Sequence, residues 1–241
     1  MYLFGLALDW QRPGARDAAL AALRHALPLA AKFGPPIDAR VNPEVHVDFE
    51  PRRALLEEAG LLLFQEKAGH YWQASTSPPR RSARLRFRSL REAGRDEFLT
   101  VLARGPAATL DRNDRYYYEL TGPRGWAEVM MGYLQTGDED LWKLGYDAEG
   151  GEAVGYFMLS PFDEQGAATI NHIGVVPEQR GRGYVDDLLA EATAEAHRRG
   201  FNSILSDVDV LNLPMRAAME RAGHRSGVRP WHVWHYRFPM A

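Results

Sequence analysis

The stretch Thr169–His197, TINHIGVVPEQRGRGYVDDLLAEATAEAH, predicts a strand, a tight turn and a helix in direct succession. The β-branched residues of Ile173–Val176 favour a strand, and Pro177 is typical of a strand end. Leucine and alanine then recur at helical spacing from Leu188 to Ala196. The turn between these elements, Gln179–Tyr184, contains two glycines and two arginines.

The composition of this turn is typical of an anion-binding loop. Amides at the start of a helix have no intrahelical acceptor, and glycine allows the backbone to approach a phosphate closely. Arg180 and Arg182 add positive charge. A tight turn without a ligand is the simpler alternative. The Walker pattern, which requires Gly-Lys-Ser/Thr, and the Rossmann pattern, which requires three spaced glycines, are both absent.

The segment Val175–Gly183, VVPEQRGRG, resembles the pyrophosphate-binding motif of the GNAT N-acetyltransferase superfamily, Arg/Gln-x-x-Gly-x-Gly/Ala. Arg180 and Gly183 fit this motif, whereas Val185 replaces its final Gly or Ala. The resemblance implies acetyl-CoA as cosubstrate, with its pyrophosphate on the amides of the turn and its thioester beside the preceding strand. A backbone N–H aimed at the thioester carbonyl would stabilise the oxyanion. The residues thereby assigned to cosubstrate binding are Ile173, Gly174, Val175, Arg180, Gly181, Arg182, Gly183, Tyr184, Val185, Asp186 and Asn212.

Asn212 has two interpretations that are compatible with each other. Members of the family place an Asn after the next strand, where it contacts the pantetheine region of the cosubstrate. Its position two residues before Pro214 is also typical of a helix N-cap.

Acetylation of an amine requires a neutral nitrogen. A lysine-like amine has a pKa of about 10.4, so a base is needed near neutral pH. The candidates are Asp207, His172 and Asp209, on strands predicted at 166–176 and 201–209. Asp207 matches the position where some family members carry a glutamate base. Asp207 and Asp209 alternate along one strand, so they share a face and could raise each other's pKa, unless one is a solvated surface residue.

The position of the family's general acid is occupied by a different residue. Many members have a Tyr four residues before the glycine that ends the next helix, and Met219 stands there before Gly223. A thiolate can leave without an acid, because a thiol has a pKa of about 8.5. The segment Asp111–Glu119, with three consecutive tyrosines, lies where the resemblance implies the acceptor site; simple packing is the alternative.

Composition narrows the class of protein. The chain of 241 residues has no cysteine, which excludes disulfides, thiolate nucleophiles and cysteine-based zinc sites. No apolar run approaches the roughly 20 residues of a membrane span, and a net charge of −3 gives no case for nucleic-acid binding. We therefore expect a cytoplasmic protein without a metal site and without a nucleic-acid or membrane partner.

The predicted fold class is α/β (α+β), with a GNAT-like mixed, twisted sheet flanked by helices. Residues 84–241 give the order βααβββαβαβ(β) that the resemblance implies for a GNAT domain, with a last strand at 231–238. Its first helix is expected at 90–103, and its second, at 110–134, is expected to break near Gly122-Pro123. Residues 1–75 give βαβαββ, a smaller half-domain whose first strand is expected at 2–8 and whose last strands are expected at 61–65 and 70–74. Residues 76–83 are predicted to link the two.

An internal repeat relates the two parts. Ile37–Asn42 parallels Ser206–Asn212, and Arg53–Gly60 parallels Arg216–Gly223. Trp72 and Trp234 follow their respective glycines at similar distances. Residues 1–75 are thus interpreted as a truncated copy of the GNAT C-terminal half that lacks the cofactor motif; chance similarity is the alternative.

The predicted function is direct transfer of an acetyl group from acetyl-CoA to an amine of a small molecule or peptide. A non-catalytic acyl-CoA-binding or scaffold protein is the alternative, and the motif would also accept a different acyl donor, because it binds the pyrophosphate. A homodimer through an open sheet edge of residues 1–75 is a further expectation.

Overall fold

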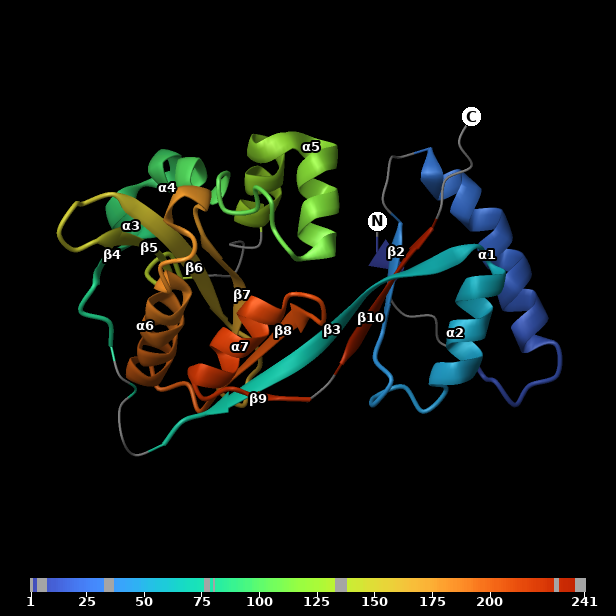
Figure 1. Cartoon of the computed structure of the whole chain (residues 1–241). Helices are drawn as coiled ribbons and strands as arrows, with labels where there is room; N and C mark the ends of the chain where they lie inside the picture. The colour runs from blue at the N-terminus through green and yellow to red at the C-terminus, as the bar shows by residue number, and fades with distance from the viewer. Residues whose placement is uncertain are drawn as a thin grey trace. The chain divides into compact units, whose positions relative to one another are not determined.

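The computed structural model describes residues 2–3, 8–32, 37–75, 79, 81–132, 138–227 and 230–236. The chain divides into two compact units (Figure 1): unit 1 is Met1–Ala68 with Arg229–Ala241, and unit 2 is Gly69–Val228. Each unit has a sheet with helices packed on it, so the predicted α/β class with a mixed sheet flanked by helices is confirmed.

Unit 2 contains the larger sheet, in the order β4-β5-β6-β7-β8-β3, with β9 beside β3. Neighbouring strands from β4 to β7 are antiparallel, whereas β7 and β8 are parallel. The strands are β3 (Leu61–Gln73), β4 (Leu85–Ser89), β5 (Trp142–Asp147), β6 (Ala153–Pro161), β7 (Ala167–Val175), β8 (Ser203–Asp209) and β9 (Arg225–Ser226). The helices are α3 (Leu90–Ala93), α4 (Arg95–Leu102), α5 (Arg112–Met131), α6 (Tyr184–Arg198) and α7 (Leu213–Arg221), with a 3-10 turn at Pro177–Gln179.

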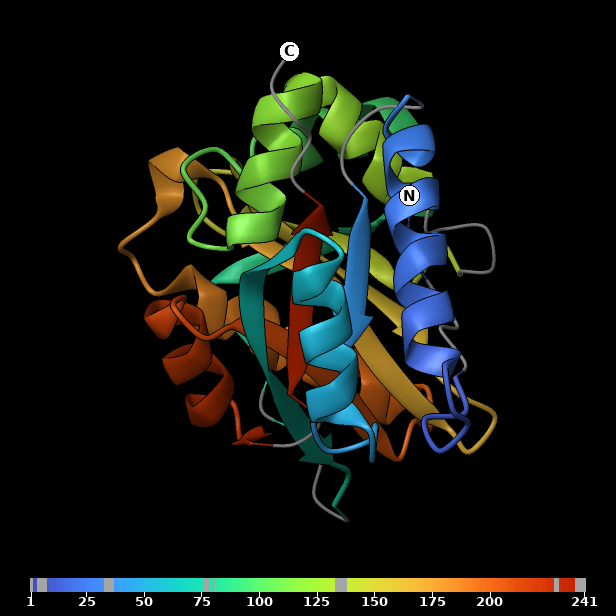
Figure 2. The same ribbon diagram turned by 90° about the vertical axis from the view of Figure 1, so that its right-hand side faces the viewer.

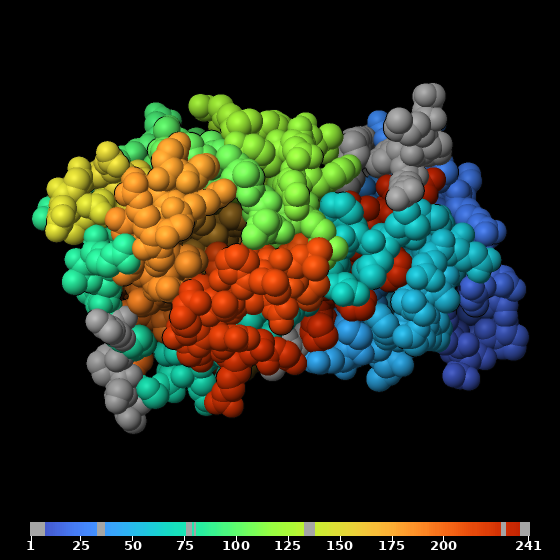
Figure 3. All heavy atoms as spheres, viewed as in Figure 1, coloured from blue at the N-terminus to red at the C-terminus, as the bar shows by residue number. Residues whose placement is uncertain are grey.

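Helices cover both faces of the sheet in unit 2. Successive residues of a strand point to opposite faces. A Cβ on Gly155 of β6 would touch Leu188 of α6, whereas the next residue, Tyr156, packs near Phe98 of α4. The helix α6 therefore lies on the opposite face from α4. Figure 3, in which α6 is orange and α7 red-orange, shows these two helices on the near surface of unit 2.

The strands β7 and β8 separate partway along their length. Their pairing covers Ala167–Thr169 and Ser203–Leu205, and both strands then continue, to Val175 and Asp209. The register of β6 against β7 shifts at Met158/Leu159, and such a bulge bends a strand and increases its twist. We call the diverging segments 170–175 and 206–209 the fork.

Among the described residues of unit 1, the strands pair in the order β1-β2-β10-β3. Its additional strands are β1 (Tyr2–Leu3), β2 (Asp38–Val41) and β10 (Trp231–Tyr236), and its helices are α1 (Ala15–Ala31) and α2 (Phe49–Glu58). Figure 2 shows α1 and α2 in front of this sheet, with β10 in red between β2 and β3. The helices bury an apolar core that consists mainly of Leu20, Leu23, Leu27, Ile37, Leu55, Leu56, Leu61 and Trp234.

The two units repeat the same order of elements, which supports the predicted internal repeat. Unit 1 runs β1-α1-β2-α2-β3, and unit 2 contains β7-α6-β8-α7-β9. In each unit one more strand pairs next to the last strand of the repeat: β10 in unit 1 and the end of β3 in unit 2. Trp234 of β10 lies in the core of unit 1, and Trp72 of β3 lies in the core of unit 2.

The compact units differ from the predicted boundaries in two ways. The two strands expected at 61–65 and 70–74 form the single strand β3, and unit 1 ends within it at Ala68 rather than at residue 75. The strand expected at the end of the domain 84–241 pairs as β10 with β2 and β3 of unit 1. Periodicity predicts a strand but carries no information about which sheet it joins.

Smaller differences have local causes. The helix expected at 90–103 is divided into α3 and α4 by Gly94, whose φ of 84° is incompatible with a continuous helix. The break expected near Gly122 in α5 is confirmed. Part of the predicted linker is anchored rather than solvated, since Arg81 donates to Glu191 and Ser82 to Asp187, both on α6. Residues 76–78 and 80 of that linker lie outside the described residues, as do 4–7 of the strand expected at 2–8.

Candidate functional site

The turn before α6 has the backbone conformation of an anion-binding loop. Gly181 and Gly183 have φ values of 78° and 76°, in the left-handed region that glycine adopts without strain. Gly183 is the N-cap of α6. A Cβ on Gly181 would meet no atom within 4 Å, so glycine is required here by the backbone angle and not by crowding.

The amides of this turn are available to a ligand. The N–H of Arg180 donates to Pro177 and that of Asp186 to Gly183, but the amides of 181–185 donate to no backbone carbonyl of a described residue. The partial positive charge of a helix N-terminus adds to the attraction for an anion. We call the amides of 181–185 the cradle.

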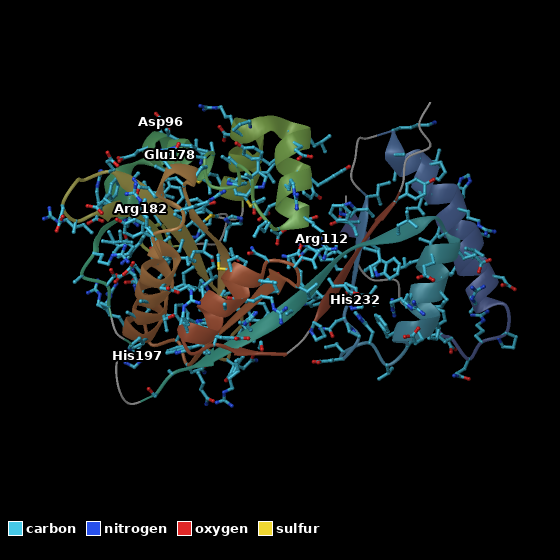
Figure 4. The ribbon with its side chains drawn as sticks, viewed as in Figure 1. Asp96, Arg112, Glu178, Arg182, His197 and His232 are labelled. Carbon is cyan, nitrogen blue, oxygen red and sulfur yellow. The ribbon has the colours of Figure 1, made fainter. Side chains whose placement is uncertain are left out.

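The two arginines of the turn have different surroundings. Arg180 donates to the carbonyl oxygens of Gly105, Ala108 and Val175, at 2.6, 3.3 and 3.1 Å. It therefore ties the loop between α4 and α5 to the end of β7. Arg182 is exposed beside the start of α6 (Figure 4).

Side chains within and next to the segment 181–185 hold the cradle in place. The hydroxyl of Tyr184 donates to Asp147 at 2.6 Å, and the guanidinium of Arg84 lies over the Tyr184 ring, 4.4 Å from its centre. Hydrogen bonds from Gly150 N–H and from Tyr184 lower the pKa of Asp147. Asp186 pairs with Arg221 at 2.8 Å, and Val185 is half-buried against the core.

On the β7 side of the fork, Ile173, Gly174 and Val175 are half-buried residues. At Gly174 a Cβ would lie 2.9 Å from the Tyr156 hydroxyl, so no larger residue fits without displacing that ring. Asn212 accepts a hydrogen bond from the N–H of Met215 at 3.3 Å, which makes it the N-cap of α7, one of its two expected roles.

His172 lies at the centre of a hydrogen-bonded group. Its Nε2 is 2.8 Å from Asp114 Oδ2 of α5, and its Nδ1 is 3.0 Å from the Tyr156 hydroxyl of β6. The edge of Trp126 packs on its ring, with centroids 4.9 Å apart. Burial raises the pKa of Tyr156 well above its usual value, so this residue keeps its proton.

The two aspartates of β8 have unlike environments. Asp209 is fully buried and accepts hydrogen bonds from Nε and Nη2 of Arg112 at 2.9 and 3.0 Å. It also accepts the N–H of Arg112, and so anchors the start of α5 (Figure 4). Asp207 is exposed. The structure therefore places neither of them in the group around His172.

A comparison with protein families identifies the part of the chain that contains the site. The model of the acetyltransferase (GNAT) family matches residues 109–224, which include α5, the fork and the cradle. This segment belongs to the GNAT acetyltransferase family. Among curated proteins, none matches the chain.

Solved structures with a similar fold include proteins named as GNAT acetyltransferases. A GCN5-related N-acetyltransferase from Sphaerobacter thermophilus has a TM-score of 0.61 and a sequence identity of 18%. The matched region covers 95% of this chain and 71% of the Sphaerobacter chain. A tandem GNAT protein from the clavulanic acid biosynthesis pathway has a TM-score of 0.61 at 15% identity, over 99% and 76%. A GCN5-related N-acetyltransferase from Kribbella flavida has a TM-score of 0.60 at 16% identity, over 95% and 77%. Family and fold together indicate an acyltransferase.

Sequence reasoning missed three residues of the candidate site. Asp114 lies within the segment expected to border the acceptor site, but its hydrogen bond to His172 spans 58 positions. Nothing in the sequence indicated a role for Tyr156 or Arg84, because the local pattern around a residue does not show which distant side chain or backbone group it will contact. Met219, at the position of the family's tyrosine, is buried in the core with 2% of its surface exposed.

Two features are absent from the residues that the structure describes. None of their helices is both long and apolar enough to cross a membrane. They contain no group of three or more histidine, aspartate or glutamate side chains arranged to hold a metal ion.

Proposed function

We propose that the protein transfers an acetyl group from acetyl-CoA directly to an amine of a small molecule or a peptide. The observation that carries the proposal is the cradle at the fork. Its amides donate to no backbone carbonyl of a described residue, which leaves them available to a pyrophosphate. The pairing of β7 with β8 ends at Thr169 and Leu205, and in this proposal the arm that carries the thioester binds along β7 beyond that point. The membership of residues 109–224 in the GNAT family supports the same chemistry.

In this proposal the amine nitrogen attacks the thioester carbonyl, and a tetrahedral oxyanion forms. A backbone N–H of β7 between Ile173 and Val175 stabilises that oxyanion. The carbon–sulfur bond then breaks and coenzyme A leaves as a thiolate. No covalent enzyme intermediate is required, in keeping with a chain that has no cysteine.

Release of free coenzyme A from acetyl-CoA, measured with and without primary amines, tests the proposal. We expect amine-dependent release and acetylated amine in equal amounts. Tight binding of acetyl-CoA with no release on any amine would instead favour the alternative, a non-catalytic acyl-CoA-binding or scaffold protein. The buried Met219 favours that alternative, since a thioether cannot donate a proton to the leaving thiolate.

The remaining parts of the proposal concern the cell and the partners. We propose that the reaction takes place in the cytoplasm and that neither a nucleic acid nor a membrane is a partner. A homodimer through unit 1 is part of the proposal, and light scattering during size-exclusion chromatography tests it.

A further inference from the structure

Both ring nitrogens of His172 are already engaged. An ionised carboxylate accepts hydrogen bonds only, so the proton between His172 and Asp114 belongs to Nε2 of the histidine. In a neutral imidazole Nδ1 is then the acceptor, and it receives the hydroxyl proton of Tyr156. His172 therefore has no lone pair left with which to take a proton from a substrate.

The three residues differ in exposure. Tyr156 is completely buried, and a Cβ on Gly105 would come within 2.3 Å of its hydroxyl. The side chain of His172 is 14% exposed and that of Asp114 is 20% exposed. Asp114 is thus the most accessible member of the group and is also the one that carries negative charge.

The position of Asp114 is fixed from two directions. Its own N–H donates to Asp111, which caps α5. The neighbouring Arg112 is held by the buried Asp209. Arg180 is a further charge near the group: it lowers the pKa of the Tyr156 hydroxyl, whereas Asp114 raises it. A carboxylate held in this way loses little freedom when it binds a cation.

We infer that Asp114 binds the acceptor as an alkylammonium ion and takes its proton, with His172 and Tyr156 as positioning residues. This inference rests on the proposed acetyl transfer. It assigns the acceptor to the class of primary alkylamines that are protonated at neutral pH, and it replaces Asp207, His172 and Asp209 as the predicted base.

The proton balance of the step is complete. The ammonium gives one proton to Asp114, and the freed lone pair attacks the thioester carbonyl. The second proton leaves the nitrogen as the carbon–sulfur bond breaks and goes to the departing thiolate. Asp114 returns its proton to solvent, so an alkylammonium ion and acetyl-CoA yield the amide, coenzyme A and one proton. Transfer to a carboxylate is uphill by about 6 pKa units in water, so it must be coupled to the attack.

The test compares two kinds of acceptor in the full-length protein at saturating acetyl-CoA. The alkylamines are 1,4-diaminobutane, spermidine, tyramine and lysine methyl ester, and aniline is the amine that is already neutral at pH 7. We expect Asp114→Asn to lower kcat/KM for the best alkylamine by about 100-fold or more, the usual contribution of a general base. The loss with aniline should be much smaller, because aniline has no proton to give up before attack.

Further readouts separate a chemical role from a structural one. The rate of Asp114→Asn with the alkylamine should rise about tenfold per pH unit toward the pKa of the amine, because solvent then supplies the neutral form. His172→Gln and Tyr156→Phe should lower kcat by about tenfold with unchanged affinity for coenzyme A. Glu128→Gln, an exposed carboxylate variant on the same helix and outside the segment Asp111–Glu119, is the matched control.

Each outcome decides a different question. If none of the tested amines makes the wild-type protein release coenzyme A, the proposed transfer and this proton path are both contradicted. Turnover by the wild type with an undiminished Asp114→Asn variant would overturn the proton path alone. Equal losses with alkylamine and aniline would also overturn it, because they would show a structural role for Asp114.

Discussion

At the scale of single residues, the cradle depends on a side chain from another part of the chain. Arg84, which precedes β4, donates to the carbonyl oxygen of Arg182 at 3.0 Å. In a trans peptide the carbonyl and the following N–H point in opposite directions. By holding the Arg182 carbonyl, Arg84 therefore orients the N–H of Gly183 toward the opposite side of the turn.

We expect Arg84→Ala to weaken coenzyme A binding by about five- to tenfold, because a hydrogen bond from a charged donor contributes about 1.5–3 kcal/mol and part of it is replaced by water. Isothermal titration calorimetry measures this change. Arg86→Ala, which removes an exposed arginine two residues along the same segment, is the control. Equal affinities in both variants would show that Arg84 does not orient the turn.

For single residues, the sequence predicted the features that depend on backbone conformation alone. The positive φ of Gly181 and Gly183 follows from the motif, because few other residues adopt that conformation. The partner of a side chain is a different matter. Nothing in the sequence indicated that Arg180 would bind three carbonyls, or that His172 would contact Asp114.

At the scale of elements, α6 presents charge as well as apolar surface to the sheet. Glu191 and Glu195 are buried on this helix with 1% and 2% exposure. Glu195 lies 2.8 Å from Lys143 of β5 and also pairs with Arg198 and Arg199. Burial alone would raise the pKa of Glu195, but the hydrogen bonds from Arg198 and Lys143 lower it to about 2.

This network predicts a pH-dependent stability. The pKa of Glu195 is lower in the folded state than the roughly 4.3 of an unfolded chain, so its stabilisation is complete above about pH 5 and is lost as the pH falls toward 2. We expect Glu195→Gln to cost about 2–4 kcal/mol at pH 7 and progressively less at acid pH.

Urea denaturation at pH 7 and pH 3 measures this effect, with the exposed Glu164→Gln as control. A loss in Glu195→Gln that is the same at both pH values would contradict the account.

Most elements were predictable because their periodicities are strong, as in α6. A break in a helix was predictable only where the glycine at positive φ has a neighbouring residue that also favours a turn. Gly122 precedes a proline and was expected to break α5, whereas Gly94 lies in a continuous helical pattern and was not. The burial of the two glutamates on α6 could not be foreseen, since two of their cationic partners, Arg81 and Lys143, lie far away in the sequence.

At the scale of the whole molecule, each compact unit has its own set of strands, and these sets do not follow the predicted domain boundaries. Unit 1 includes β10 from the end of the sequence, and unit 2 includes the last residues of β3. The sequence repeat aligned Trp72 with Trp234, yet it could not show that each lies in the core of the other half of the chain. Strand pairing of this kind is decided by tertiary contacts that local patterns do not encode.

This arrangement predicts that the two tryptophans affect opposite units. Replacing a buried Trp by Ala costs about 3–5 kcal/mol. We expect Trp234→Ala to raise amide hydrogen exchange in α1 and α2 and to preserve coenzyme A binding. Trp72→Ala should raise exchange in β8 and α7 and weaken that binding. The reverse pattern, measured by mass spectrometry, would contradict the assignment of the strands.

In the proposed function, the amides of the cradle bind the pyrophosphate of the cosubstrate. Gly183 and Gly14 provide a matched pair, because each is the N-cap of a long helix, with φ of 76° and 77°. A Cβ would meet only Arg84 Nη1 at 4.0 Å near Gly183 and nothing within 4 Å at Gly14, so alanine strains the backbone alike at both sites.

Calorimetric titration of coenzyme A into Gly183→Ala and Gly14→Ala is therefore the most direct measurement. We predict that affinity falls by about tenfold or more in Gly183→Ala, because the strained residue moves the amides out of register with the anion. The affinity of Gly14→Ala should equal that of the wild type. Unchanged affinity in Gly183→Ala would contradict the claim.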